Sequence, residues 1–311
     1  MKKWLVYCVV AMLLLAASVP AFAQAEALDS TPRLAIVSAF GPEIVLMLQE
    51  AEVDATYTIN GVEFTTGTLM GNDVVLFLSG VSTVNTAMNI QSAIDHFNVS
   101  HIIFSGIAGG VDPALHIGDV VVPEQWGQYL EMEYARETAP DEFSNTGMFE
   151  YNFDNFGMMF PRPVTVYSDS VTEGESKFWF PVDPDMFAVA QSIEATLESD
   201  LLQCNAEEVC LTEAPELIVG GNGVSGPVFV DNAEFREYAF ATFEAAVLDM
   251  ETASAAMVAY ANEIPFIGFR SLSDLAGGGE GANEMGTFFS IAADNAALVV
   301  MDFLSAWAEQ G

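Results

Sequence analysis

Three acidic residues each follow an apolar run that could form a buried strand: Glu43, Glu251 and Asp274. The carboxyl ends of strands in an α/β sheet form the edge at which such folds bind ligands. Carboxyl groups gathered there could protonate a leaving group, activate a water molecule and stabilise a developing positive charge. The spacing also allows a simpler interpretation, in which Glu43 favours a helix start and the other two are ordinary caps.

Glycine-rich or small-residue segments accompany these acids. Four of the segments end an apolar run, namely Ala39–Glu43, Ser105–Gly110, Leu248–Ala253 and Phe269–Gly277, and the fifth is the glycine-rich stretch Val219–Val230. Glycine permits close approach of the backbone to a ligand. The joint placement of acids and glycines favours one shared site over independent caps.

The elements that must position these residues alternate between strands and helices. Strands are expected at Leu34–Ala39, Val53–Thr58, Val62–Leu69, Asp73–Ser79, His101–Ser105, Asp119–Pro123, Leu217–Gly220, Ala245–Asp249 and Pro265–Ser271. Helices are expected at Glu43–Ala51, Asn85–Phe97, Thr252–Ala261 and Met285–Trp307, the last with room for an interruption. Hairpin-type turns are expected at Asn60-Gly61 and Gly71-Asn72. Several strands are apolar on both faces, which predicts a single α/β domain with a central mixed, twisted sheet flanked by helices.

One long segment does not follow this alternation. Residues Gln125–Pro184 are rich in Phe, Tyr, Asn, Asp and Pro and have no clear periodicity. A loop of this length in a compact domain is usually functional. We interpret it as an insertion or lid over the sheet, within one domain that covers residues 24–311.

The charge of the chain is strongly acidic. Eight Lys and Arg residues stand against 44 Asp and Glu, for a net charge of −36, while 51% of the 311 residues are hydrophobic. This hydrophobic content can support a large core and excludes a disordered chain. The negative surface repels phosphate groups and so disfavours binding to nucleic acids and to anionic membranes. An acidic surface of this kind affects the solubility of the protein but gives no information about its fold.

The N-terminus has the layout of a secretory signal peptide. Lys2 and Lys3 precede an apolar stretch from Trp4 to Ala17, and Ala21-Phe-Ala23 has the small residues of a cleavage site. Cleavage after Ala23 would release a periplasmic or secreted protein without stable membrane binding. The alternative is an uncleaved membrane anchor.

Two cysteines remain beyond that segment, Cys204 and Cys210. In an oxidising compartment we expect them to form a disulfide. The histidines His96, His101 and His116 are scattered without metal-ligand spacing. We therefore expect no metal site and no cofactor.

The order of the motifs resembles the purine nucleoside phosphorylase superfamily, and most of all its 5′-methylthioadenosine/S-adenosylhomocysteine nucleosidases. The motifs that carry this resemblance are Ile36–Glu43, Ser79–Val81, Ser105–Gly110 with Ile117–Val121, Asp249–Ala253 and Arg270–Ala276. The long segment and the Gly278–Asn283 extension are similar to the secreted, plant storage-protein-like branch. The resemblance implies a nucleoside phosphorylase-like fold and a homo-oligomer, with a dimer favoured.

The resemblance also implies roles for the three acids. Asp274 would protonate the purine at N7 as the base leaves. Glu251 would hold the ribose 2′- and 3′-hydroxyls, with Met250 packed on the sugar. Glu43 would orient and deprotonate the attacking water.

Further roles follow from the same resemblance. Phe229 would stack on the base, with an ordinary core aromatic as the alternative, and the Val230 backbone would contact the edge of the base. Arg270 and Ser273 would support the loop that carries Asp274. Ala108 and Gly109 would line the pocket for the water or anion.

These roles suit cleavage of the N-glycosidic bond of a purine nucleoside. The ribosyl carbon becomes cationic as the bond breaks, and the purine leaves easily only when protonated. A phosphorylase must also hold a phosphate dianion, usually with Arg or Lys. The motifs at Gly41, Ser79-Gly80 and Ile107–Gly110 contain neither, which favours water. Ile107 replaces a serine of the nucleosidases and predicts a drier nucleophile pocket. A phosphorylase and a non-catalytic secreted nucleoside-binding or storage protein remain the alternatives.

Overall fold

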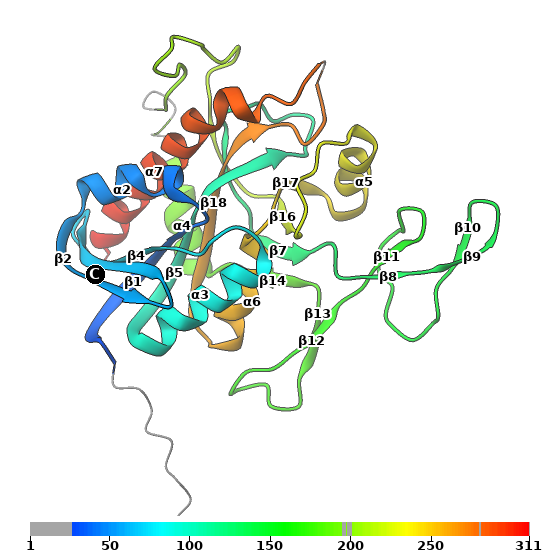
Figure 1. Ribbon diagram of the computed structural model, residues 1–311, viewed down its shortest axis with the longest axis horizontal. Coiled ribbons are helices and arrows are strands. Elements are labelled where there is room, and N and C mark those ends of the chain that lie inside the picture. Colours follow the sequence, from blue (N-terminus) through cyan, green and yellow to red (C-terminus); the bar gives the residue numbers. More distant parts are fainter. Residues whose placement is uncertain (1–26, 195–196, 198–200, 280, 311) are drawn as a thin grey trace, which may run out of the picture.

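The computed structural model describes residues 27–194, 197, 201–279 and 281–310. The expected signal peptide at residues 1–23 lies outside the described residues. Figure 1 shows a central sheet with helices on both sides and a group of small strands that extends away from it.

The central sheet is mixed and contains twelve strands. The main path of the sheet runs in the order β14-β7-β16-β17-β5-β1-β4-β3-β2, and β18, β6 and β15 branch from β5. The bounds are β1 Asp29–Ser38, β2 Glu52–Ile59, β3 Val62–Leu69, β4 Asn72–Leu78, β5 Phe97–Gly110, β6 Val120–Val122, β7 Gln125–Gln128, β14 Trp179–Pro181, β15 Leu217–Val219, β16 Asn222–Ser225, β17 Ala245–Asp249 and β18 Phe266–Asp274.

Parallel strands form the centre of this sheet. β1 pairs in parallel with β4 and β5, and β18 pairs in parallel with β5. Every residue of β18 is buried, as expected for a strand that helices cover on both faces. This arrangement places the ends of β1, β5 and β18 side by side, so the segments that follow them meet at one edge.

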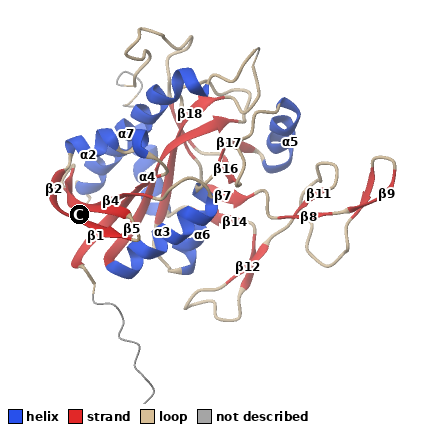
Figure 2. Cartoon of the chain, in the orientation of Figure 1, coloured by secondary structure: helices blue, strands red, loops and turns tan. Residues whose placement is uncertain are grey.

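Helices cover both faces of the sheet (Figures 1 and 2). One face carries α2 (Val45–Glu50), α4 (Pro184–Ile193) and α7 (Met285–Ala308), with α7 packed along β18 and β5. The other face carries α3 (Thr83–His96) and α6 (Thr252–Ala261), which contact each other, and α5 (Ala233–Phe243) lies beside β17.

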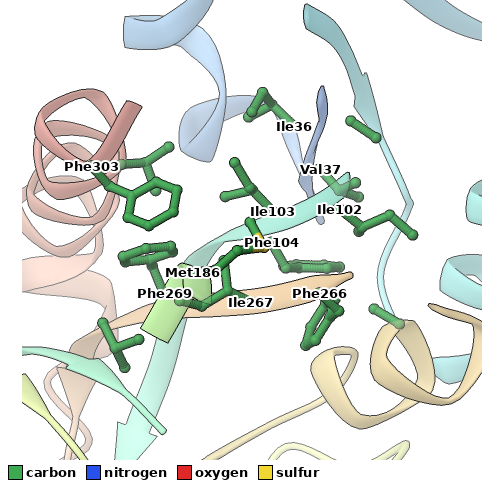
Figure 3. Packing of buried hydrophobic residues seen from close by; sticks show 14 of the residues in the cluster. Ile36, Val37, Ile102, Ile103, Phe104, Met186, Phe266, Ile267, Phe269 and Phe303 are labelled. Carbon is green, nitrogen blue, oxygen red and sulfur yellow. The ribbon is translucent and has the colours of Figure 1, made fainter. Parts of the chain in front are cut away.

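The hydrophobic core lies between α7 and the parallel strands. Figure 3 shows Ile36, Ile103, Phe269 and Phe303 converging there, and all four side chains are fully buried. Burial of each such side chain contributes about 1.5–3 kcal/mol. α7 is long and apolar enough to cross a membrane, but 61% of its most apolar window is buried inside the fold, which is typical of a core helix.

The structure corrects three details of the predicted elements. The second hairpin turn lies at Met70-Gly71, where φ is 46° and 78°, and not at Gly71-Asn72. The glycine segment Gly106–Gly110 is the end of β5 and not a loop, because β17 and β18 hydrogen-bond to it on either side. Helix α7 has no interruption.

The segment Gln125–Pro184 differs from the expected lid. Its two ends belong to the central sheet as β7 and β14, which pair with each other. Between them the chain forms two-stranded hairpin ladders that extend away from the sheet (Figure 1). These strands are β8 Met132–Tyr134, β9 Arg136–Ala139, β10 Glu142–Ser144, β11 Met159–Pro161, β12 Val164–Val166 and β13 Glu175–Lys177. We call this part the projecting arm.

Candidate active site

A cavity of about 300 Å³ opens at the edge where the central strands end, and all three predicted acids line it. The other predicted site residues that line it are Met250, Phe229, Val230, Ala108, Gly109 and Ser273. Arg270 is the exception and lies behind the wall of the cavity. No residue of the projecting arm is among the described residues that line the cavity.

Glu43 ends the short 3-10 helix η1 (Gly41–Glu43), which follows β1. Its Oε2 accepts hydrogen bonds from the backbone N–H groups of Ala39, at 2.7 Å, and Phe40, at 3.2 Å. Its Oε1 accepts a third bond from the Ile107 N–H at 2.8 Å. The side chain is thus held between β1 and β5 with one edge toward the cavity.

Glu251 is the residue that precedes helix α6, and Met250 separates it from the end of β17. Its Oε1 accepts a hydrogen bond from the Ser82 N–H at 2.7 Å. Its Oε2 lies 3.4 Å from Nη2 of Arg270. The carboxylate therefore connects the start of α3 with the buried guanidinium.

Asp274 is the last residue of β18. Its Oδ2 accepts a hydrogen bond from Ser273 Oγ at 3.0 Å, and its Oδ1 accepts one from the Ala276 N–H at 2.8 Å. Ser273 thus contacts Asp274 directly. A β-bulge relative to β5, between Leu272 and Asp274, changes the direction in which Asp274 points.

Arg270 supports a different part of the site from the one predicted. Its Nε lies 2.8 Å from Oδ2 of Asp249, and its Nη1 donates to the Ile107 carbonyl at 2.9 Å and lies 3.8 Å from Oε1 of Glu43. The guanidinium therefore pairs with Glu43, Asp249 and Glu251, and no ion pair joins it to Asp274. The guanidinium is fully buried, so its positive charge is balanced by these carboxylates and not by solvent.

Asp249 is a residue of the site that sequence reasoning did not single out. Its carboxylate accepts from the hydroxyls of Ser225 and Thr252 and from the Glu251 and Thr252 N–H groups. Asp249 thereby fixes Glu251 and Arg270 relative to β16 and α6. A sequence signal was present, because a lone Arg in an apolar strand requires buried carboxylate partners.

Burial shifts the titration of all three acids. Loss of solvent raises the pKa of Glu43 and of Asp274 above their usual values, because burial disfavours the charged form. Burial raises the pKa of Glu251 to about 7, against the opposing effect of the Arg270 charge. The raised pKa of Asp274 favours the protonated form that a general acid needs.

The raised pKa of Glu251 predicts a pH dependence of stability. Its folded-state pKa lies above the unfolded value, so its contribution is complete below about pH 4.5 and is lost as the pH rises through about 7. Its effect on the free energy of unfolding is at most about 1.4 kcal/mol per pH unit. Urea denaturation between pH 5 and pH 8 should show a shallower decline for Glu251→Gln than for the wild type. An unchanged slope in the variant would contradict the assignment.

Gly106 allows Glu43 and Arg270 to approach each other across β5. A Cβ atom at this position would lie 2.4 Å from Glu43 Oε1 and 2.6 Å from Arg270 Nη1. We expect Gly106→Ala to displace both groups and to lower turnover about 10²-fold. Gly286→Ala is the matched control, since nothing lies within 4 Å of its Cβ position. Equal steady-state activity of the two variants would refute this role of Gly106.

Phe229 and Val230 form part of the cavity wall. Phe229 is 51% exposed, so it is not an ordinary core aromatic, and its ring is available to a planar ligand. Val230 is buried. Met250 and Leu248 complete the apolar side of the same cavity.

No Lys, Arg or His is present among the described residues that line the cavity. Within the same described part of the chain, no group of three or more His, Cys, Asp or Glu side chains is placed to hold a metal ion. The disulfide between Cys204 and Cys210 lies outside the cavity. The chemistry of the cavity therefore rests on carboxyl groups, backbone groups and apolar walls.

Comparisons with known proteins agree with this fold. The chain is 27% identical to bark storage protein A of Populus deltoides over 228 residues, which are 72% of each chain. It is 24% identical to the 5′-methylthioadenosine/S-adenosylhomocysteine nucleosidase of Tolumonas auensis over 273 residues, 88% of this chain and 98% of that one.

A solved structure shows the same architecture. The 5′-methylthioadenosine/S-adenosylhomocysteine nucleosidase from S. pneumoniae, with a transition-state inhibitor, superposes with a TM-score of 0.65 at 22% identity, over 88% of this chain and 99% of that one. The family described as the phosphorylase superfamily matches residues 33–305. Since this match covers most of the chain, the protein belongs to the phosphorylase superfamily.

Proposed function

We propose that the protein hydrolyses the N-glycosidic bond of a purine nucleoside of the 5′-methylthioadenosine, S-adenosylhomocysteine or adenosine type and releases the free base. The observation that supports this proposal is the convergence of Glu43, Glu251 and Asp274 on one cavity. The nucleosidase names of the relatives support the same class of reaction.

In the proposed reaction Asp274 is the general acid. Its protonated carboxyl donates to N7 of the purine while the bond from the base to the ribosyl carbon breaks. Phe229 stacks on the base, and the Val230 backbone contacts its edge. The wall formed by Ala108 and Gly109 holds the nucleophile near the sugar.

The other two acids act on the sugar and on water. Glu251 accepts hydrogen bonds from the ribose 2′- and 3′-hydroxyls, and Met250 packs on the ring. Glu43 removes a proton from water as its oxygen bonds to the cationic ribosyl carbon. Arg270 holds the carboxylates of Glu43 and Glu251 in place, since its guanidinium lies within 4 Å of both.

Water rather than phosphate is the proposed nucleophile. The described cavity wall contains no cationic side chain, and Arg270 is already paired with three carboxylates. A phosphate dianion beside Glu43 would meet repulsion without a compensating charge.

A base-release assay tests the proposal. The purified protein is incubated with methylthioadenosine, adenosine and inosine, with and without phosphate, and the free base is measured. Release without phosphate is the expected result. Release only with phosphate would identify a phosphorylase. Binding without release would identify a nucleoside-binding or storage protein, the alternative favoured by the resemblance to bark storage protein A.

We further propose that residues 24–311 form the mature, exported chain and that it pairs as a homodimer. The disulfide between Cys204 and Cys210 supports an oxidising compartment. Export is tested by mass spectrometry of the protein purified from the producing cells, which should show an N-terminus at Gln24. Dimerisation is tested by analytical ultracentrifugation, which should give twice the monomer mass. A chain that retains Met1 in the membrane fraction would contradict export by cleavage.

A further inference from the structure

Asn283 links the proposed general acid to a second carboxylate. Its Oδ1 accepts a hydrogen bond from the Met285 N–H at 2.9 Å, which fixes the orientation of the amide. Its Nδ2 then faces two carboxylates, with Asp231 Oδ1 at 3.1 Å and Asp274 Oδ1 at 3.3 Å. The NH₂ group has two hydrogens and can therefore donate one hydrogen bond to each carboxylate.

A close backbone approach places Asp231 beside this amide. Gly277 has φ of +90°, and a Cβ atom there would lie 2.2 Å from the Asn232 backbone nitrogen. The Asn232 N–H donates to the Ala276 carbonyl at 3.2 Å. The segment that follows β18 is thereby joined to the segment that carries Phe229 and leads into α5.

These contacts make the two oxygens of Asp274 inequivalent. Oδ1 accepts from two N–H donors, Ala276 and Asn283. Among the described residues, Oδ2 accepts from the Ser273 hydroxyl alone. A carboxyl proton on Oδ1 would oppose two N–H hydrogens that cannot turn away. The Ser273 hydroxyl can rotate and donate to the Ala108 carbonyl, 3.4 Å from its Oγ, so the proton belongs on Oδ2.

We propose that Asn283 and Asp231 are positioning residues for the acid: Asn283 directs the carboxyl proton of Asp274 to Oδ2, and Asp231 keeps that proton bound. The reaction that uses this proton is the proposed nucleoside hydrolysis. Neither residue needs to touch the substrate, because both act through Asp274.

The two residues act in opposite directions on the acid. The negative charge of Asp231 raises the pKa of Asp274, whereas the hydrogen bond from Asn283 lowers it. Burial is the largest cause of the raised pKa, and the hydrogen bonds from Ala276 and Ser273 oppose it. The pair therefore adjusts a proton affinity that burial has already increased.

Other charged groups near Asp274 belong to neighbouring elements. From α5, the Arg236 guanidinium lies against Gly278, where a Cβ would be 2.7 Å from Nη1, and its Nε donates to the Gly110 carbonyl at 2.9 Å. Glu284 precedes α7. Glu43 and Glu251 line the same cavity. Only Asp231 shares a hydrogen-bond donor with Asp274 among these groups.

The direct test measures the pKa of Asp274 by NMR of ¹³C-labelled Asp carboxyls, with its signal assigned by comparison with Asp274→Asn. We expect Asp231→Asn to lower this pKa by about half a unit to one unit, and Asn283→Ala to raise it by a similar amount. Asp169→Asn, an exposed acid on the projecting arm, removes the same charge and should leave it unchanged. Because Asp231 is exposed, the effect of its substitution should shrink in 1 M salt.

This measurement does not depend on turnover, so it separates the inference from the proposed function. If the wild type releases no base but the two opposite shifts appear, the proposed function fails and the positioning role stands. If base is released but neither substitution moves the pKa, the positioning role is overturned. Where Asn283→Ala fails to fold, Asn283→Asp keeps the acceptor for Met285 and should raise the pKa further.

Kinetics give the second readout. The basic limb of the pH profile of kcat/KM reports an acid that must be protonated. It should move to lower pH in Asp231→Asn and to higher pH in Asn283→Ala, with KM little changed and the acid limb in place. A fall in melting temperature with an unmoved basic limb would show that Asn283 is only structural.

Discussion

Asp274→Asn is expected to lower turnover about 10³-fold, while the affinity for the nucleoside changes less than tenfold. The amide has nearly the shape of the carboxyl group but cannot release a proton to the departing purine. The change therefore removes stabilisation of the transition state and leaves ground-state contacts in place. Single-turnover base release and equilibrium binding of methylthioadenosine measure the two quantities separately.

The matched control is Ser273→Ala. It removes the hydroxyl that donates to Asp274 Oδ2 at 3.0 Å but keeps the acid, so a much smaller loss of turnover is expected. Full activity of Asp274→Asn would remove Asp274 from the mechanism. Loss of binding together with turnover would instead assign it to substrate affinity.

Arg270→Met is expected to destabilise the fold by about 3–5 kcal/mol, the cost of removing one partner of a buried ion pair. The guanidinium is fully buried and lies close to three carboxylates. Without it, these groups must ionise without a counter-charge or bind protons. Urea denaturation measures the loss, and the deficit should shrink at lower pH because the acids become neutral.

Arg136→Met is the control for this substitution. Arg136 is exposed on β9 of the projecting arm, where a surface charge contributes at most about 1 kcal/mol. Equal free energies of unfolding for the two variants would contradict the role of Arg270. Arg270→Lys should restore only part of the stability, since an ammonium group lacks the planar fork that reaches several partners.

The sequence was sufficient to predict that the three acids meet. Apolar runs that end in acids predict strands whose carboxyl ends share an edge, and the structure places Glu43, Glu251 and Asp274 around one cavity. The alternation of strands and helices likewise predicted a mixed sheet covered on both faces, which the structure confirms.

The direction of individual side chains could not be predicted from the sequence. In a regular strand Arg270 and Asp274 would lie on the same face, but the bulge between Leu272 and Asp274 interrupts the alternation. Arg270 therefore forms ion pairs with Glu43 and Glu251 and does not support the Asp274 loop. The polar, aperiodic segment of the projecting arm also gave no sign of where its hairpins would extend.

The described part of the cavity wall has no cationic side chain, which bears on the substrates that the proposed reaction can use. A nucleotide brings a 5′-phosphate dianion, and both the local acids and the net charge of −36 oppose its entry. We therefore expect the proposed hydrolysis to favour nucleosides without a phosphate group over nucleotides. A nucleotide would become a substrate of the proposed reaction only after a phosphatase had removed its 5′-phosphate.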